Sequence, residues 1–319
     1  MRSRCRPPGR PREAASGFSR GGSAHVLSSS PSSSAGEGTL LAETGGVGYR
    51  SAGQERGVAE TAPGEKTVRL ERDGAIAVVT FDRPEKRNAL SPREHHALQE
   101  ICFELRRDFE TRVVVLTGAG SVFSAGADLA QPREESRPTN DLERRHRARI
   151  GDRTVAALES LDQITIAAIN GACVGGGAVL ALACDLRVIA AEAWISLPEV
   201  ELGLPLTWGA LPLLVREIGP ARTIELVTTC ERIDAETAHR WGLVNHVVAE
   251  GALALAREIA ERIVRRPAVP VAMTKSVVRA LRGSSRQGDV TETDGDLYWL
   301  GIRLGGFTPR KPGGGSKPG

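Results

Sequence analysis

The chain has 319 residues, of which 40% are hydrophobic and 25% are charged, an ordinary balance for a globular protein of one large domain or two small ones. Its 42 basic and 39 acidic residues nearly cancel, and a net charge of +3 argues against nucleic acid as the main partner. The five cysteines are odd in number and widely spaced, which favours reduced thiols over a disulfide framework. Without a His/Cys cluster, the sequence predicts no metal site.

Residues 1–64 differ in composition from the rest of the chain. They are rich in Ser, Gly, Pro and Arg, and they hold too little apolar surface to offset the entropy lost on ordering. Three interpretations stay open: a disordered or wrongly annotated extension, a short regulatory arm, or an organelle transit peptide. The last is suggested by Glu13 as the sole acid among several Arg residues in 1–36. We expect a cytoplasmic protein, or a mitochondrial one if this stretch is a transit peptide.

Strands and helices are expected to alternate from about residue 66 onward. The apolar run 75–81 predicts a buried strand. Ser91-Pro92 then begins a helix, with Ser91 as N-cap and Glu94 completing a capping box. Further strands are predicted at 113–116, 164–169 and 186–190, and further helices at 141–160, from 176, and at 209–217, 220–229, 235–241, 252–265 and 270–282. This alternation indicates an α/β fold.

The uncharged stretch 164–184 is long enough to cross a bilayer. Asn170-Gly171 and the three glycines at 175–177 interrupt it, so we expect a strand, a loop and a buried helix, and no membrane association.

Two glycine-bearing loops, 123–129 and 170–180, each follow a buried strand. Glycines let a backbone approach a ligand closely, and a helix that begins at Gly176 adds free N–H donors. Two such N–H groups that converge from separate loops would form an oxyanion hole, which stabilises the negative charge that develops on a carbonyl oxygen. Either loop by itself is more typical of an ordinary tight turn.

Five segments in this order resemble the crotonase (enoyl-CoA hydratase/isomerase) superfamily over about 220 residues. They are Arg83-Pro-Glu-Lys-Arg-Asn-Ala-Leu90, Ser124-Ala-Gly-Ala-Asp-Leu129, the Asn170–Asp185 stretch, Pro198-Glu-Val-Glu-Leu-Gly203 and Ala235-Glu-Thr-Ala with Gly242-Leu-Val244. The resemblance implies a spiral of repeated ββα units over 65–250, a helical region at 251–305 and a flexible tail at 306–319. It also implies an acyl-CoA substrate, no separate cofactor, and a homotrimer or hexamer.

Carried over by position, the resemblance implies backbone oxyanion donors at Ala127 and Gly176 and an acid/base group at Glu199. The positions that match the substrate channel are Lys86, Arg87, Ala125, Asp128, Leu129, Val179 and Trp208. Asp128 is equally expected to fix its loop. Trp208 is expected to reshape the floor of the acyl site, because the family often has a Pro-Gly-rich turn there.

The resemblance also bears on the reaction, because hydratases of this family place a water between two glutamates. Here Val179 stands at the first of these positions and Glu199 at the second. A single carboxylate is the pattern of the family's Δ3,Δ2-enoyl-CoA isomerases, and apolar neighbours should raise its pKa by desolvation. One alternative is a hydratase that replaces the missing carboxylate with Glu201, expected on the same strand face as Glu199, or with a group that does not touch the substrate directly. The other is a non-catalytic acyl-CoA-binding protein.

Two further features are expected to have no catalytic role. His95 and His96 are predicted on the exposed part of a helix. The basic stretch 144–153 is predicted to be a solvated helix face, with contact to the CoA phosphates as a secondary role.

Overall fold

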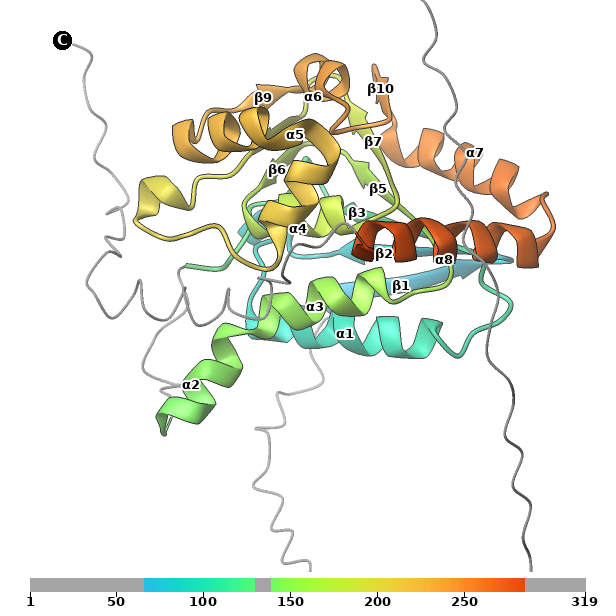
Figure 1. Cartoon of the computed structure of the whole chain (residues 1–319). Helices are drawn as coiled ribbons and strands as arrows, with labels where there is room; N and C mark the ends of the chain where they lie inside the picture. Colours follow the sequence, from blue (N-terminus) through green and yellow to red (C-terminus); the bar gives the residue numbers. More distant parts are fainter. Residues whose placement is uncertain (1–65, 130–138, 285–319) are drawn as a thin grey trace, which may run out of the picture. The chain divides into compact units, whose positions relative to one another are not determined.

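The computed structural model of this protein describes residues 66–129 and 139–284 (Figure 1). The predictions for the extension 1–64, for the tail 306–319 and for the helical region beyond residue 284 lie outside these residues. Within the described ranges, no helix combines the length and the apolar character that a membrane span requires.

A six-stranded sheet in the order β1-β2-β3-β5-β7-β10 forms the centre of the fold. It pairs β1 and β2 antiparallel and the remaining neighbours parallel. The strands are β1 Val68–Asp73, β2 Ile76–Phe81, β3 Val113–Gly118, β5 Ile164–Ile169, β7 Leu186–Ala190 and β10 His246–Val248. Strands β2 and β3 are buried along their whole length, which explains why their sequences are largely apolar. The four strands predicted from such runs are confirmed.

A second, four-stranded sheet consists of strands of only two or three residues. They are β4 Val122–Ser124, β6 Ala172–Val174, β8 Trp194–Ser196 and β9 Ile233–Asp234, in the order β4-β6-β8-β9. The sequence did not predict them, because so few residues carry no readable alternation. Each of β4, β6 and β8 follows a long strand of the first sheet and precedes a helix, so the repeated ββα units of the expected spiral are present.

The helices follow the predictions except at Arg149, where one predicted helix is divided into two. They are α1 Pro92–Leu105, α2 Asp141–Ala148, α3 Ile150–Glu159, α4 Gly176–Ala183, α5 Ala210–Thr229, α6 Ala235–Trp241, α7 Ala252–Val264 and α8 Ala268–Ser284. The helix predicted over 141–160 is wrong as a single element, because Arg149 leaves helical geometry between α2 and α3. Gly219 interrupts α5 with a φ of 78°, as the two separate predictions required. The capping box at Ser91 and Glu94 is present.

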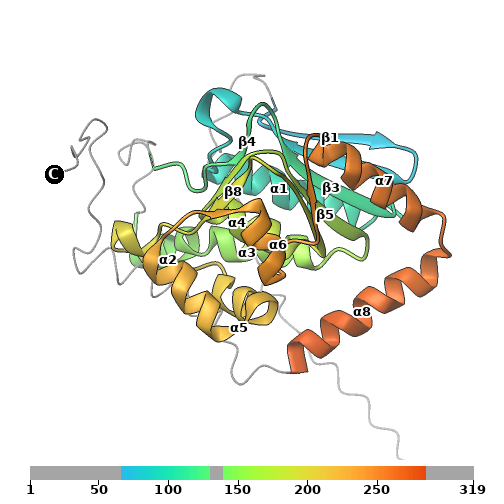
Figure 2. The ribbon, with the colours of Figure 1, turned by 90° about the horizontal axis from the view of Figure 1, so that it is seen from above.

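Helix α7 packs on β3 and β5, whereas α1 packs on α3 (Figures 1 and 2). The last described helix, α8, is tied to the core by Lys275, whose side chain is 6% exposed. Its Nζ lies 2.7 Å from the Asp185 carboxylate and donates to the Gln163 carbonyl, also at 2.7 Å. The same carboxylate accepts from the backbone N–H and the hydroxyl of Thr165. This buried ion pair therefore joins α8 to the start of β7.

We expect Lys275→Ala to lower the free energy of unfolding by about 3 kcal/mol, because it leaves the Asp185 carboxylate without its cation. The matched control is Arg279→Ala on the same helix, whose ion pair with Asp162 is exposed and spans 3.7 Å. Such an exposed pair should contribute less than about 1 kcal/mol. Chemical denaturation measures both variants, and equal losses would contradict a special role for Lys275.

Candidate active site

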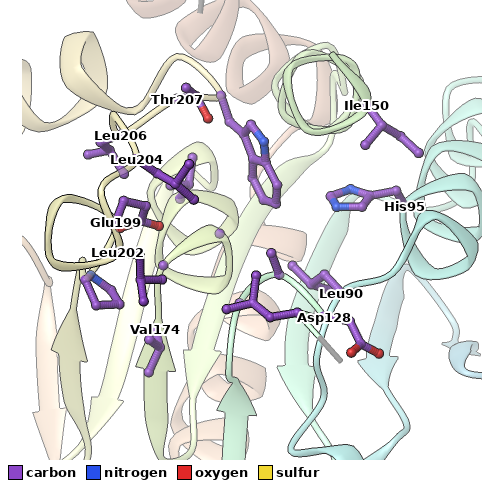
Figure 3. A pocket seen from close by; sticks show the side chains of 18 of the residues that line it. Leu90, His95, Asp128, Ile150, Val174, Glu199, Leu202, Leu204, Leu206 and Thr207 are labelled. Atoms are coloured by element: carbon purple, nitrogen blue, oxygen red, sulfur yellow. The ribbon is translucent and has the colours of Figure 1, made fainter. Parts of the chain in front are cut away.

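A cavity of about 290 Å³ lies where the loop after β4, the start of α4, the segment between β8 and α5, and helices α1 to α3 meet (Figure 3). Its wall is largely apolar, and a few polar groups are set into it. Such a site suits a mostly apolar ligand that a small number of polar contacts orient.

The two glycine-bearing loops touch each other at this cavity. Gly126 has a φ of +79°, and a Cβ at this position would lie 2.7 Å from the Val174 carbonyl oxygen and 3.2 Å from the Gly176 nitrogen. A side chain would therefore force the loops apart. Ser124 holds the first loop, because its hydroxyl donates to the Asn88 carbonyl and accepts from the Gly126 N–H.

Two backbone N–H groups in the cavity wall are available to a ligand. The Leu90 N–H donates to Gly126, and the Asp128 N–H donates to Leu90, so the Ala127 N–H between them has no acceptor among the described residues. Gly176 is the first residue of α4, where an N–H has no intrahelical acceptor. The structure thus brings both predicted oxyanion donors to one cavity.

Glu199 contributes a buried carboxyl group to the same cavity. Burial raises its pKa from about 4.5 to about 7, and within the described part of the chain its Oε2 atom has no hydrogen-bond partner. Its Oε1 lies 2.7 Å from the position that a Cβ on Gly175 would take, so this glycine makes room for the carboxylate. A carboxyl group with this pKa can accept and return a proton near neutral pH.

The expected strand at 198–203 is wrong. Glu199 precedes a 3₁₀ helix, η2 Val200–Leu202, which has three residues per turn. Residues two apart therefore point in different directions, and Glu201 is exposed and does not line the cavity. The prediction that Glu201 shares a face with Glu199 fails for this reason.

The predicted channel residues divide into two groups. Ala125, Asp128 and Leu129 line the cavity. Lys86 and Arg87 are exposed on the 3₁₀ helix η1 Pro84–Lys86 and at its end, outside the cavity wall. The carbonyl of Arg87 nevertheless accepts from the Ala125 N–H at 2.9 Å, so it supports the first loop through its backbone.

The carboxylate of Asp128 is engaged with Arg83, whose Nη2 lies 3.3 Å away. Arg83 also contacts Glu94, at 3.0 Å, and Glu94 belongs to the capping box of α1. This arrangement ties the first loop to α1. Of the two roles expected for Asp128, the geometry supports the one that fixes the loop.

Val179 and Trp208 both line the cavity. Val179 has no group that can exchange a proton, so this position offers no second carboxyl. Trp208 has a left-handed backbone, with a φ of 62°. Its indole lies against two glycines. A Cβ at Gly151 would lie 2.0 Å from the ring, and a Cβ at Gly176 would lie 2.2 Å from it. The indole therefore fills the space between α3 and the start of α4.

The prediction for His95 is wrong. Its side chain is buried and lines the cavity, and its Nδ1 lies 2.9 Å from the Thr154 hydroxyl of α3. The packing of α1 on α3 covers this residue. A signal was present in the sequence, because His95 stands three residues before Leu98 and seven before Cys102, on the buried stripe of the helix. His96 is exposed, as expected.

Among the residues that the structure describes, no three His, Cys, Asp or Glu side chains gather in a way that could hold a metal ion. Of the basic stretch 144–153, Arg147 belongs to the cavity wall, and it forms an ion pair with Glu143 one helical turn earlier. Arg144, Arg145 and Arg147 are exposed, as predicted, whereas Arg149 and Arg153 are half-buried, so the solvated face does not extend over the whole stretch.

The site thus combines two backbone donors that have no acceptor among the described residues with a protonatable carboxyl group in an apolar enclosure. Donors of this kind stabilise negative charge on a carbonyl oxygen, and the carboxyl group can move the neighbouring proton. These features suit an enzyme that acts on a carbonyl compound.

Sequence comparison identifies the family. Residues 71–298 match the enoyl-CoA hydratase/isomerase family, and the chain belongs to it. A short-chain-enoyl-CoA hydratase of Clostridium acetobutylicum is 37% identical over 211 residues, which cover 66% of this chain and 79% of the relative. Among solved structures, an enoyl-CoA hydratase from Bacillus anthracis matches with a TM-score of 0.64 and 33% identity, over 75% of this chain and 92% of that one. A monofunctional enoyl CoA isomerase from M. smegmatis matches with a TM-score of 0.59 and 33% identity, over 70% and 97%.

Proposed function

We propose that this enzyme is a Δ3,Δ2-enoyl-CoA isomerase in which Glu199 is the single proton carrier. The observation that carries the proposal is the buried Glu199 carboxyl group in a cavity where Val179 takes the place of a second acid. Among the described residues of the cavity wall, the other carboxylate, that of Asp128, is engaged with Arg83.

In the proposed reaction the thioester oxygen accepts hydrogen bonds from the N–H groups of Ala127 and Gly176. The Glu199 carboxylate removes a proton from C2, and the C–H electron pair moves into the enolate, whose negative charge lies on that oxygen. When the carbonyl re-forms, the conjugated electrons take the proton back from Glu199 at C4. The double bond has then moved from C3–C4 to C2–C3, and no water is consumed.

The competing candidate is a hydratase, the activity named for the C. acetobutylicum relative. Addition of water to a 2-enoyl-CoA requires a group that holds and activates the water beside the first carboxylate. Glu201 was the predicted substitute, but it is exposed and lies outside the cavity wall. The geometry therefore favours isomerisation. The expected trimer or hexamer and the cellular compartment stay predictions.

Separate incubations with 3-hexenoyl-CoA and 2-hexenoyl-CoA test the proposal, with conjugation to the thioester followed by absorbance. We expect absorbance to rise with the 3-enoyl substrate and to stay constant with the 2-enoyl substrate. Loss of the 2-enoyl absorbance would instead establish a hydratase. If neither substrate reacts while acyl-CoA still binds, the protein is a non-catalytic acyl-CoA-binding member of the family.

The pH dependence of kcat/KM should report the raised pKa of Glu199. The base must be ionised to accept a proton, and burial moves its pKa to about 7, so protonation removes the active form below that pH. We expect kcat/KM for 3-hexenoyl-CoA to fall by about tenfold per pH unit below pH 7 and to level off above it. Initial rates between pH 5 and pH 9 measure this, and a profile that stays flat down to pH 5 would contradict the assignment.

A further inference from the structure

The wall of the cavity opposite Glu199 carries an unusual polar group, the imidazole of His95 (Figure 3). Its side chain is 3% exposed and packs edge-on against the Trp208 indole, with ring centroids 4.9 Å apart and planes at 86°. Burial lowers the pKa of His95 to about 4, so the ring is neutral at physiological pH. A neutral imidazole has one nitrogen that donates and one that accepts.

The hydrogen bonds around Thr154 determine which ring nitrogen of His95 carries the proton. The Thr154 hydroxyl lies 2.8 Å from the Ile150 carbonyl oxygen, which can only accept, so the hydroxyl proton is directed there. The same hydroxyl oxygen accepts from Gln99 Nε2 at 2.7 Å. Its remaining contact, at 2.9 Å to His95 Nδ1, must therefore also be an accepted bond. Nδ1 carries the proton, and Nε2 holds a lone pair.

This lone pair faces the cavity. Nε2 has no hydrogen-bond partner within the described residues, but protein atoms do not enclose it completely. The accessible space next to His95 is the cavity itself, where its neighbours in the wall are apolar, among them Ile150 and Leu90. An unsubstituted alkyl chain in this space would remove water from the lone pair and offer no donor in return, which costs free energy.

We propose that His95 determines the acyl specificity of this enzyme: its Nε2 accepts a hydrogen bond from a hydroxyl group on the acyl chain of the CoA thioester, across the cavity from Glu199. The inference rests on the proposed function, because it takes the cavity to be the acyl site. It names the substrate class as hydroxylated acyl-CoA. Thr154 acts as a positioning residue that holds the ring and its tautomer.

Binding of unreactive saturated thioesters tests the proposal independently of catalysis. Calorimetry compares ω-hydroxyacyl-CoAs of four to eight carbons with their unsubstituted counterparts. At one chain length we expect the hydroxylated ligand to bind about tenfold more tightly. His95→Phe keeps a flat ring of similar size and should abolish this preference, whereas the matched variant His96→Phe, at the exposed neighbouring position, should keep it. Thr154→Val should reduce the preference, because the variant lacks the hydroxyl that keeps the proton of His95 on Nδ1.

The tautomer provides a second test that does not depend on variants. In ¹⁵N-histidine-labelled protein with the His95 signals assigned, we expect a protonated Nδ1 and an unprotonated Nε2 whose resonance moves when the hydroxylated ligand binds. A protonated Nε2, or equal affinities at every chain length, would overturn the role of His95 while the proposed isomerase stands. Failure of every acyl-CoA to bind would refute both.

Discussion

Glu199→Gln should reduce kcat for 3-enoyl-CoA isomerisation by roughly 10³-fold and change KM little. The amide has nearly the size of the carboxyl group, so the cavity keeps its shape, but it cannot carry the proton between C2 and C4. Steady-state kinetics with 3-hexenoyl-CoA measure the effect. The loss should appear in kcat, because the carboxylate interacts with the proton during its transfer and contributes little to binding of the ground-state substrate.

The control for this substitution is Glu201→Gln, two residues along the chain. Glu201 is exposed and does not line the cavity, so the variant should retain the rate of the parent enzyme. A Glu199→Gln protein that isomerises at the parent rate, or a Glu201→Gln protein that has lost activity, would reverse the assignment of the base.

The second large effect is expected at Gly176. Its N–H is a proposed oxyanion donor, and a Cβ on this residue would lie 2.2 Å from the Trp208 ring, so Gly176→Ala must move the indole, the amide or both. Loss of one oxyanion donor costs on the order of 10²-fold or more in kcat. We expect a decrease of about 10²-fold in Gly176→Ala, measured under saturating 3-hexenoyl-CoA.

Gly151→Ala separates the two causes. A Cβ on Gly151 would meet the same indole from α3, at 2.0 Å, but this residue contributes no proposed donor. If displacement of Trp208 accounts for the loss in Gly176→Ala, both variants should be impaired alike. If the amide matters, as we propose, Gly151→Ala should keep most of its kcat. Thermal unfolding of both proteins verifies that the fold is retained.

Several parts of the fold could be predicted because their signals are local. The run 113–116 is apolar throughout and 164–169 is apolar except for Thr165, and a strand buried on both faces requires such a pattern. Ser91, Pro92 and Glu94 lie within one turn and complete their capping box among themselves. For these features the residues that interact are neighbours in the chain or belong to one motif.

The sequence by itself determined the family, four strands of the six-stranded sheet, most of the helices, and Ala127, Gly176 and Glu199 as candidate site residues. Only the tertiary structure decided that Glu199 sits before a 3₁₀ turn with its carboxyl group enclosed, that Glu201 faces away, and that His95 belongs to the cavity. The physical reason is that burial, pKa and the direction of a side chain depend on segments distant in sequence. Thr154 orients His95 from a helix that begins some fifty residues later in the chain, and no local pattern records that contact.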